Sequence, residues 1–205
     1  MNTQLYLITP AKIDAGFAAV LEAALDAGDV AALQLRLKDH TAEDIRQLAP
    51  ELIRIAQRRG VAVIMNDSVK LANELGCDGL HIGQSDGSVK EARASLGKTG
   101  MLGVTCHDSR HLAMQAGEQG ADYVAFGAFF PTTTKDTLHV ADIDIISWWV
   151  ELFELPCVAI GGITTDNCTP LIEAGADFLA VSSGVWDHED GPAAAVKAFN
   201  VLCAR

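Results

Sequence analysis

The sequence predicts a single α/β domain, a (β/α)8 TIM barrel, spanning residues 1–205. Two observations carry this prediction. A junction in which a helix is followed by glycine and then by a short apolar strand recurs along the chain, at Gly28, Gly76, Gly120 and Gly175. The spacing between successive glycines is too long for one βα unit and suits two. The second observation is that a further apolar run falls in each interval where the extra strand is expected.

Eight predicted strands alternate with helical segments, and their nearly continuous apolar runs are typical of a parallel sheet covered by helices. In order they are contained in QLYLIT, VAALQLR, VAVIMN, GLHIG, MLGVT, YVAFG, PCVAIGG and DFLAVSS. A doubly wound sheet would be expected to carry a G-x-G-x-x-G turn after its first strand, and LITPAKID has none. The pattern therefore favours a closed barrel.

The predicted helices carry recognisable signals. Each junction glycine is expected to be the left-handed residue that ends its helix. TAED, from Thr41, predicts a capping box, and apolar residues from Ile45 to Ile55 follow at helical spacing. Pro50 predicts a kink or a restart of this helix. IDIISWWVELF, from Ile143, predicts an apolar helix whose tryptophans serve packing or a subunit contact, which leaves a homo-oligomer open.

The charge and composition of the sequence argue against several kinds of binding partner and cofactor. The net charge of -12 argues against nucleic acid and anionic membranes, because both require a basic surface. No apolar run approaches the roughly 18 residues of a membrane span, and MNTQLYLITP lacks the features of a signal peptide. The five cysteines are scattered without a C-x-x-C pair, which argues against a disulfide framework or a zinc site and for core thiols. We therefore expect a cytoplasmic protein that acts on small molecules.

Polar residues gather where the predicted strands end, which is where barrels carry their chemistry. In LQLRLKD, Gln34, Arg36 and Lys38 lie two residues apart and so share one side of a strand that is otherwise leucine. An exposed edge strand would show the same alternation, but a closed barrel has no edge. Arginine and lysine pointing inward together can clamp a phosphate.

Two carboxylates follow neighbouring strands. Asn66 and Asp67 end the third strand, and Asp86 follows the fourth in HIGQSD. Either aspartate alone could simply cap the next helix. Together with the amide they make a set of hard oxygen ligands, which predicts an Mg²⁺ site completed by water and substrate phosphate.

The remaining strand ends predict a second anion site. FPTTTKD, from Phe130, offers three hydroxyls and a lysine, although by itself it is also typical of a surface loop. AIGGIT and VSSG end the last two strands, where barrels often bind phosphate with backbone amides. GVTCHD contributes Thr105 and His107. His107 could be catalytic or structural, whereas His81, inside its strand, is expected to be an interior residue.

The ordered set QLRLK, ND, HIGQSD, GVTCHD, FPTTTK, AIGGI and VSS resembles the thiamine phosphate synthase family over essentially the whole chain. Enzymes of this family join hydroxymethylpyrimidine diphosphate to a thiazole phosphate, or its carboxylate, and release diphosphate and thiamine monophosphate. The resemblance implies that the pyrimidine diphosphate contacts Gln34, Arg36, Lys38, Asn66, Thr105 and Lys135. It implies Asp67 and Asp86 as Mg²⁺ ligands. For the thiazole phosphate it implies Thr132, Thr133, Thr134, Gly162, Ser182 and Ser183.

The residues agree with this division of labour. Diphosphate leaves more readily when Mg²⁺ and the cations Arg36, Lys38 and Lys135 neutralise its developing charge, and Thr105 lies among them. The electron-rich aminopyrimidine can stabilise the cation left behind, which favours a dissociative path without a side-chain nucleophile. Thr105 departs from the serine usual in the family but keeps the hydroxyl. The segment after Lys135 lacks the usual Gly-Leu, which affects the expected packing of the next helix.

Two alternatives stay open at this point. A thiazole tautomerase on the same barrel would need an acid-base residue, for which His107 is available, but no metal-bound diphosphate. A non-catalytic phosphate-binding barrel would keep Gly162 and Ser182 and would not need the cations of the second strand.

Overall fold

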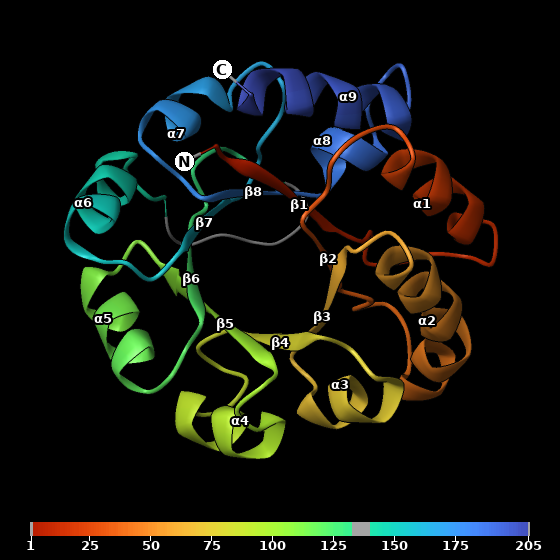
Figure 1. Cartoon of the computed structure of the whole chain (residues 1–205), viewed down its shortest axis with the longest axis horizontal. Coiled ribbons are helices and arrows are strands. Elements are labelled where there is room, and N and C mark those ends of the chain that lie inside the picture. Colours follow the sequence, from red (N-terminus) through yellow and green to blue (C-terminus); the bar gives the residue numbers. More distant parts are fainter. Residues whose placement is uncertain (1, 133–139, 205) are drawn as a thin grey trace.

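The computed structural model describes residues 2–132 and 140–204, and its eight parallel strands close into a barrel in chain order. Helices surround the strands on all sides (Figure 1). The strands are β1 (Gln4–Ile8), β2 (Ala32–Leu35), β3 (Ala62–Asn66), β4 (Gly79–Ile82), β5 (Met101–His107), β6 (Tyr123–Phe126), β7 (Cys157–Ile160) and β8 (Phe178–Val181). The helices are α1 (Phe17–Leu25), α2 (Ala42–Gln57), α3 (Val69–Leu75), α4 (Val89–Leu96), α5 (Arg110–Glu118), α6 (Asp144–Leu152), α7 (Thr169–Glu173), α8 (Ser183–Trp186) and α9 (Pro192–Cys203). The predicted TIM barrel is confirmed.

Strand alternation divides the core into two layers. Leu33 and Leu35 of β2 point outward into a large apolar layer between the strands and the helices. The barrel interior holds a smaller cluster, with Tyr6 and Tyr123 as its largest members. Gln34 and His81 are buried polar residues on the interior side of these strands, next to this smaller cluster.

Helix α2 begins as predicted and continues further than predicted. The Thr41 hydroxyl accepts from the backbone N–H of Asp44, and the Asp44 carboxylate accepts from the N–H of Thr41, which completes the capping box. Of the two outcomes expected at Pro50, the restart is wrong, because Ala42–Gln57 is one continuous helix with the proline inside it; the kink stays a prediction. Packing of Leu52 and Ile55 on the barrel offsets the hydrogen bond that proline removes.

Three of the four junction glycines behave as predicted, and one does not. Gly76, Gly120 and Gly175 have positive φ. Gly28 is not among the positive-φ glycines of the described chain, so its predicted conformation is wrong. It is instead a point of close approach: a Cβ at Gly28 would lie 2.2 Å from Oδ1 of Asn200, which holds the adjacent backbone of Asp29 through both its amide atoms.

The aromatic helix α6 is largely a packing element. Trp149 is 1% exposed, stacks on Phe153, and donates from Nε1 to the carbonyl of Leu155 at 2.7 Å. Trp148 lies beneath the guanidinium of Arg110, 4.5 Å from the ring centroid. A subunit contact through this helix stays a prediction. That the whole chain forms one domain also stays a prediction.

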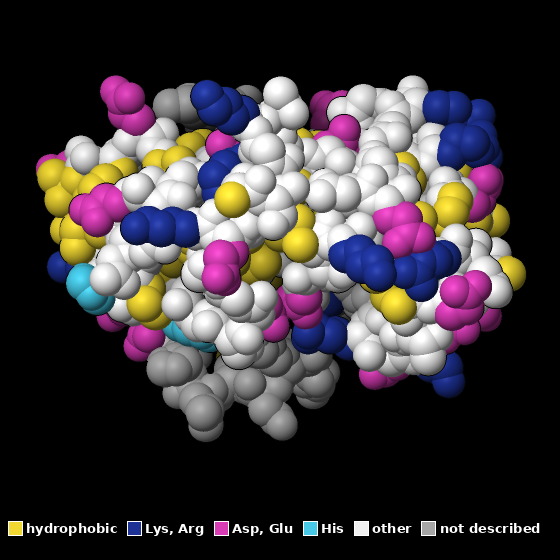
Figure 2. All heavy atoms as spheres, turned by 90° about the horizontal axis from the view of Figure 1, so that it is seen from below, with side chains coloured by type: hydrophobic (Ala, Val, Ile, Leu, Met, Phe, Trp, Pro, Cys, Tyr) yellow, Lys and Arg dark blue, Asp and Glu magenta, His cyan; other side chains and the backbone are white. Residues whose placement is uncertain are grey.

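The helical surface is mixed in charge. Figure 2 shows Lys and Arg side chains interleaved with Asp and Glu on one side of the molecule. Ion pairs such as Arg46 with Glu74, at 2.6 Å, join neighbouring helices. Within residues 2–132 and 140–204, no helix is both long enough and apolar enough to cross a membrane. The five cysteines are all free, and four of them are buried, as expected of core thiols.

Three aspartates close the amino-terminal end of the barrel in the same way. Asp78, Asp122 and Asp177 each precede an even-numbered strand, and the carboxylate of each accepts from a backbone N–H in the first two residues of the strand before it: Val63, Leu102 and Cys157 respectively. The distance from Leu102 N to Asp122 Oδ2 is 2.7 Å, and Arg93 pairs with the same carboxylate. This end of a barrel serves stability, whereas the opposite end serves chemistry.

Replacing Asp122 with alanine should therefore destabilise the barrel without altering its chemistry. The variant leaves the N–H of buried Leu102 without its acceptor, which costs about 1–3 kcal/mol. Urea unfolding should show this loss, while kcat of the folded enzyme stays unchanged. Glu118→Ala removes an exposed carboxylate of α5 and should leave both quantities unchanged. Equal stability of the two variants would contradict the assigned role of Asp122.

Candidate active site

A cavity of about 510 Å³ opens at the carboxyl ends of the strands. Its volume falls within the range of about 300–1,000 Å³ that is usual for small-molecule sites. Eleven of the predicted site residues line it: Gln34, Arg36, Lys38, Asn66, Asp67, Asp86, Thr105, Thr132, Gly162, Ser182 and Ser183. The other three, Thr133, Thr134 and Lys135, lie outside the described residues. The structure thus gathers into one cavity every predicted site residue that it describes.

The second strand places its polar residues as its alternation predicts. Gln34, only 3% exposed, donates from Nε2 to the hydroxyl of Tyr6 at 3.0 Å. Arg36 and Lys38 follow on the same side and line the cavity, whereas the intervening leucines are buried on the other side. The backbone N–H of Arg36 donates to Thr9 Oγ1 at 2.9 Å, which fixes the strand end beneath the guanidinium.

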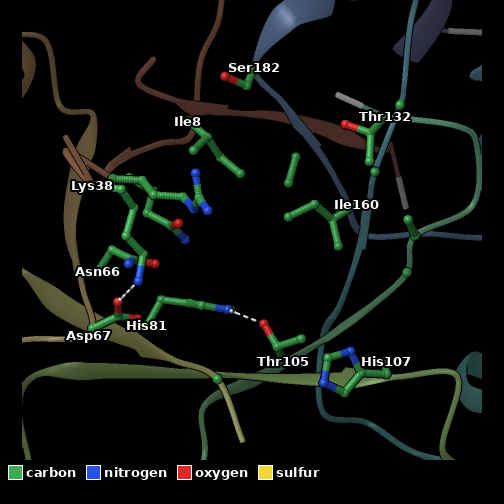
Figure 3. A pocket seen from close by; sticks show the side chains of 18 of the residues that line it. Ile8, Lys38, Asn66, Asp67, His81, Thr105, His107, Thr132, Ile160 and Ser182 are labelled. Atoms are coloured by element: carbon green, nitrogen blue, oxygen red, sulfur yellow. Dashed lines mark hydrogen bonds and ion pairs between the residues drawn. The ribbon is translucent and has the colours of Figure 1, made fainter. Parts of the chain in front are cut away.

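Two carboxylates face one another beside these cations. The Lys38 ammonium pairs with Asp67 (Figure 3). Asp67 has a φ of 62° and donates its backbone N–H to the carbonyl of His81 at 2.8 Å, which turns the side chain toward the cavity. The Asp86 carboxylate accepts from Gly83 N at 2.9 Å. A Cβ at Gly83 would lie 2.8 Å from that carboxylate, so glycine is what allows this turn.

The raised pKa of Asp67 indicates that the part of the cavity around Asp67 and Asp86 would accept a cation. Removal from water raises the pKa of Asp67, and the charge of Asp86 raises it further, while Lys38 opposes both effects only in part. Within the described chain no cluster of three or more Asp, Glu, His or Cys side chains forms a metal site. Two carboxylates and the Asn66 amide nevertheless fit Mg²⁺, which usually takes one or two protein carboxylates and completes its shell with water and phosphate.

Asp67→Asn should stabilise the ligand-free protein at neutral pH. Because the folded-state pKa is raised, the carboxylate costs stability as pH rises above the unfolded value of about 3.9, and this cost is complete above the folded-state pKa. The variant should melt at a higher temperature than the wild type at pH 7 and lose this advantage in acid. Calorimetry at both pH values tests this. Adding Mg²⁺ with diphosphate should stabilise the wild type more than the variant; a variant less stable than wild type at pH 7 would contradict the account.

The far side of the cavity is made of backbone and hydroxyl groups. Gly161 and Gly162 have φ values of 105° and 64°. Asn167 holds their loop by donating to the carbonyl of Gly162 at 2.9 Å. Thr132 and Ser182 lie across the cavity from Lys38 and Asp67 (Figure 3). The cavity therefore has two polar sides, one with charged side chains and one with amides and hydroxyls.

Between these sides lies an apolar surface that the sequence motifs did not indicate. Ile8, Ile160 and Ala180 line the cavity from β1, β7 and β8. Their signal was available, because all three lie in strands that the sequence predicts, and alternation along each strand assigns every second residue to the barrel interior. Such a surface suits a flat heteroaromatic ring. His107 also lines the cavity, and Gln84 donates to the carbonyl of Thr105 at 2.6 Å.

His81 is interior, as predicted, and also forms part of the cavity wall. It is 5% exposed, and its two ring nitrogens lie 3.0 Å from the Tyr123 hydroxyl and 2.8 Å from the Thr105 hydroxyl. The structure thus joins a predicted site residue, Thr105, to two residues that sequence reasoning left out, Tyr6 and Tyr123.

Comparison with known proteins identifies the family of this chain. The family model described as thiamine monophosphate synthase matches residues 5–185. The thiamine-phosphate synthase of Rhodospirillum centenum is 59% identical over 97% of this chain and 97% of its own length, and that of Hyphomonas neptunium is 54% identical over 98% and 94%. A thiamine phosphate pyrophosphorylase from Pyrococcus furiosus superimposes with a TM-score of 0.86, at 27% identity over 98% of this chain and 95% of that one. The chain belongs to the thiamine monophosphate synthase family of transferases.

Proposed function

We propose that this enzyme joins hydroxymethylpyrimidine diphosphate to thiazole phosphate, or its carboxylate, and releases diphosphate and thiamine monophosphate. The observation that carries the proposal is the cavity with two chemically different polar sides and an apolar surface between them. Two phosphorylated heterocycles fit such a cavity because each phosphate has its own side and each ring shares the apolar surface.

The charged side would take the diphosphate. Arg36 offers a planar pair of donors and Lys38 a point charge, so together they bind and orient a diphosphate as its bond to carbon breaks. Asp67 and Asp86, with Asn66 nearby, would hold Mg²⁺, which when bound neutralises charge on the diphosphate oxygens. Lys38, whose ammonium pairs with Asp67 in the structure, would turn to the diphosphate once a cation takes over Asp67.

The amide and hydroxyl side would take the thiazole phosphate. Gly162 N–H, Thr132 and the backbone at Ser182 and Ser183 supply neutral donors, which bind a phosphate without adding charge near the leaving group. From the family pattern we assign Thr133 and Thr134 to the same phosphate and Lys135 to the diphosphate. Holding the thiazole this way would bring its nitrogen to the pyrimidine carbon as diphosphate departs.

A dissociative substitution fits the described wall of the cavity. The described wall contains no cysteine, and four of its hydroxyl-bearing residues are assigned above to the two phosphate groups: Thr105, Thr132, Ser182 and Ser183. Protein side chains then act by position and charge rather than by covalent attack. The apolar surface of Ile8, Ile160 and Ala180 would keep water away from the pyrimidine cation until the thiazole nitrogen reaches it.

The experiment is an assay of purified protein with both phosphorylated substrates, with and without Mg²⁺. We expect thiamine monophosphate and diphosphate in equal amounts, and only with the metal present. Asp67→Ala should abolish this reaction. A tautomerase would instead isomerise the thiazole carboxylate phosphate and would tolerate Asp67→Ala, and a non-catalytic barrel would bind phosphate without turnover. Either result would overturn the proposal.

A further inference from the structure

A continuous chain of buried hydrogen bonds crosses the barrel beneath the cavity. It runs from Gln34 to Tyr6 at 3.0 Å, from Tyr6 to Tyr123 at 2.9 Å, from Tyr123 to His81 at 3.0 Å and from His81 to Thr105 at 2.8 Å. Gln34 and Thr105 line the cavity at its two ends, and the aromatic members between them come from β1, β6 and β4. The family resemblance implies substrate contacts for Gln34 and Thr105, whereas the three aromatic residues that join them have no assigned role.

The side chains that form this chain of hydrogen bonds are buried and closely packed. Tyr6, Tyr123, Gln34 and His81 are each less than 9% exposed. The His81 ring stacks on Tyr123 with 5.6 Å between centroids, and Tyr6 meets Tyr123 edge to face. A Cβ at Gly103 would lie 1.9 Å from Tyr123 Cζ, so the glycine makes room for the ring. Burial raises the pKa of Tyr6 to about 12 and that of Tyr123 well above its usual value, so both remain hydroxyl donors at neutral pH.

Along this chain of hydrogen bonds, only one direction of donation gives the buried hydroxyl hydrogens of both tyrosines an acceptor. The Gln34 amide donates to Tyr6, so Tyr6 can pass its own hydrogen to Tyr123, and Tyr123 passes its hydrogen to Nδ1 of His81. In the reverse direction Tyr6 would accept twice, and its own hydrogen would be buried without an acceptor in the chain, which costs about 1–3 kcal/mol. No buried side-chain polar atom of the described residues lacks a partner.

We infer that this chain holds His81 as the tautomer with hydrogen on Nε2, and thereby makes Thr105 a one-way donor into the cavity. Because Nε2–H donates to Thr105 Oγ1, the threonine must direct its own hydrogen elsewhere, and the cavity is where the side chain opens. On the proposed function, on which this role rests, the acceptor is an oxygen of the diphosphate. His81, Tyr123 and Tyr6 are then positioning residues that act through Thr105.

A double-mutant cycle tests whether Tyr123 acts through Thr105. Thr105→Val, which removes the hydroxyl but keeps the shape, should lower kcat by about 10²–10³-fold, and Thr105→Ser should restore most of it. Tyr123→Phe should lower kcat about 10- to 100-fold. In the Thr105→Val background the same Tyr123→Phe change should cost less than about threefold, because the group it positions is gone. Multiplicative losses would show a merely structural role and overturn the inference.

The tautomer can be read without substrate, which separates this inference from the proposed function. In ¹⁵N-histidine-labelled protein, the His81 signals, assigned by their loss in His81→Asn, should show hydrogen on Nε2 and none on Nδ1. Tyr6→Phe keeps Tyr123 as donor and should preserve this state, whereas Tyr123→Phe should allow hydrogen on Nδ1. Hydrogen on Nδ1 in the wild type would overturn the inference, whatever reaction the enzyme catalyses.

Discussion

Arg36→Ala should lower kcat by about 10²–10³-fold and leave the fold intact. The guanidinium lines the charged side of the cavity, where it would stabilise charge that grows as the diphosphate departs. The contact that Arg36 makes for the fold is its backbone N–H to Thr9 Oγ1, and alanine retains it. Initial rates at saturating substrate, together with the melting temperature, measure the two effects separately.

Two further variants sharpen this test. Arg36→Lys keeps the charge but loses the planar pair of donors, so its kcat should lie between those of wild type and Arg36→Ala. Arg58→Ala removes an arginine at the end of α2, away from the cavity, and should leave kcat unchanged although it removes one positive charge, as Arg36→Ala does. Comparable losses in Arg36→Ala and Arg58→Ala would mean that only the overall charge matters, against the account.

On the amide and hydroxyl side of the cavity, Gly162→Ala should cause a large loss of activity although it adds a single carbon atom. A Cβ there would lie 2.3 Å from the carbonyl oxygen of Pro131 and 2.7 Å from that of Phe130, both backbone atoms that cannot swing aside. The φ of 64° adds about 1–2 kcal/mol for a residue with a side chain. Displacing this loop by about 1 Å should reduce kcat/KM for thiazole phosphate by about 100-fold.

Gly60→Ala separates steric displacement from backbone strain. Gly60 has a φ of 74°, but nothing lies within 4 Å of the position of its Cβ. Both variants should lose stability in urea unfolding, because both place alanine at positive φ. Only Gly162→Ala should lose activity per folded molecule. Full activity in Gly162→Ala would remove the loop from the phosphate site.

The sequence was most informative wherever local periodicity decides the outcome. Alternation alone placed Gln34, Arg36 and Lys38 inside the barrel, and the burial of Leu33 and Leu35 on the other face confirms it. The capping box at Thr41 depends on a few neighbouring residues and is likewise confirmed. The glycine rule succeeded at Gly76 because the helix ending there needs a left-handed residue.

It was least informative wherever a role depends on distant contacts. Gly28 is explained by Asn200, which lies in α9 at the other end of the chain. Tyr6 and Tyr123 resemble ordinary apolar strand residues, and only barrel closure brings their hydroxyls together. The continuous helix through Pro50 shows tertiary packing prevailing over a local preference.

On the proposed function, one cavity binds two phosphorylated groups on two different sides. Calorimetric titration of wild type, Arg36→Ala and Gly162→Ala with Mg²⁺-diphosphate, and separately with thiazole phosphate, tests it most directly. We predict a crossed result: Arg36→Ala weakens diphosphate binding at least tenfold and spares thiazole phosphate, whereas Gly162→Ala does the reverse, where tenfold corresponds to about 1.4 kcal/mol. Equal weakening of both ligands by both variants would show that the two phosphorylated groups do not bind on separate sides of the cavity.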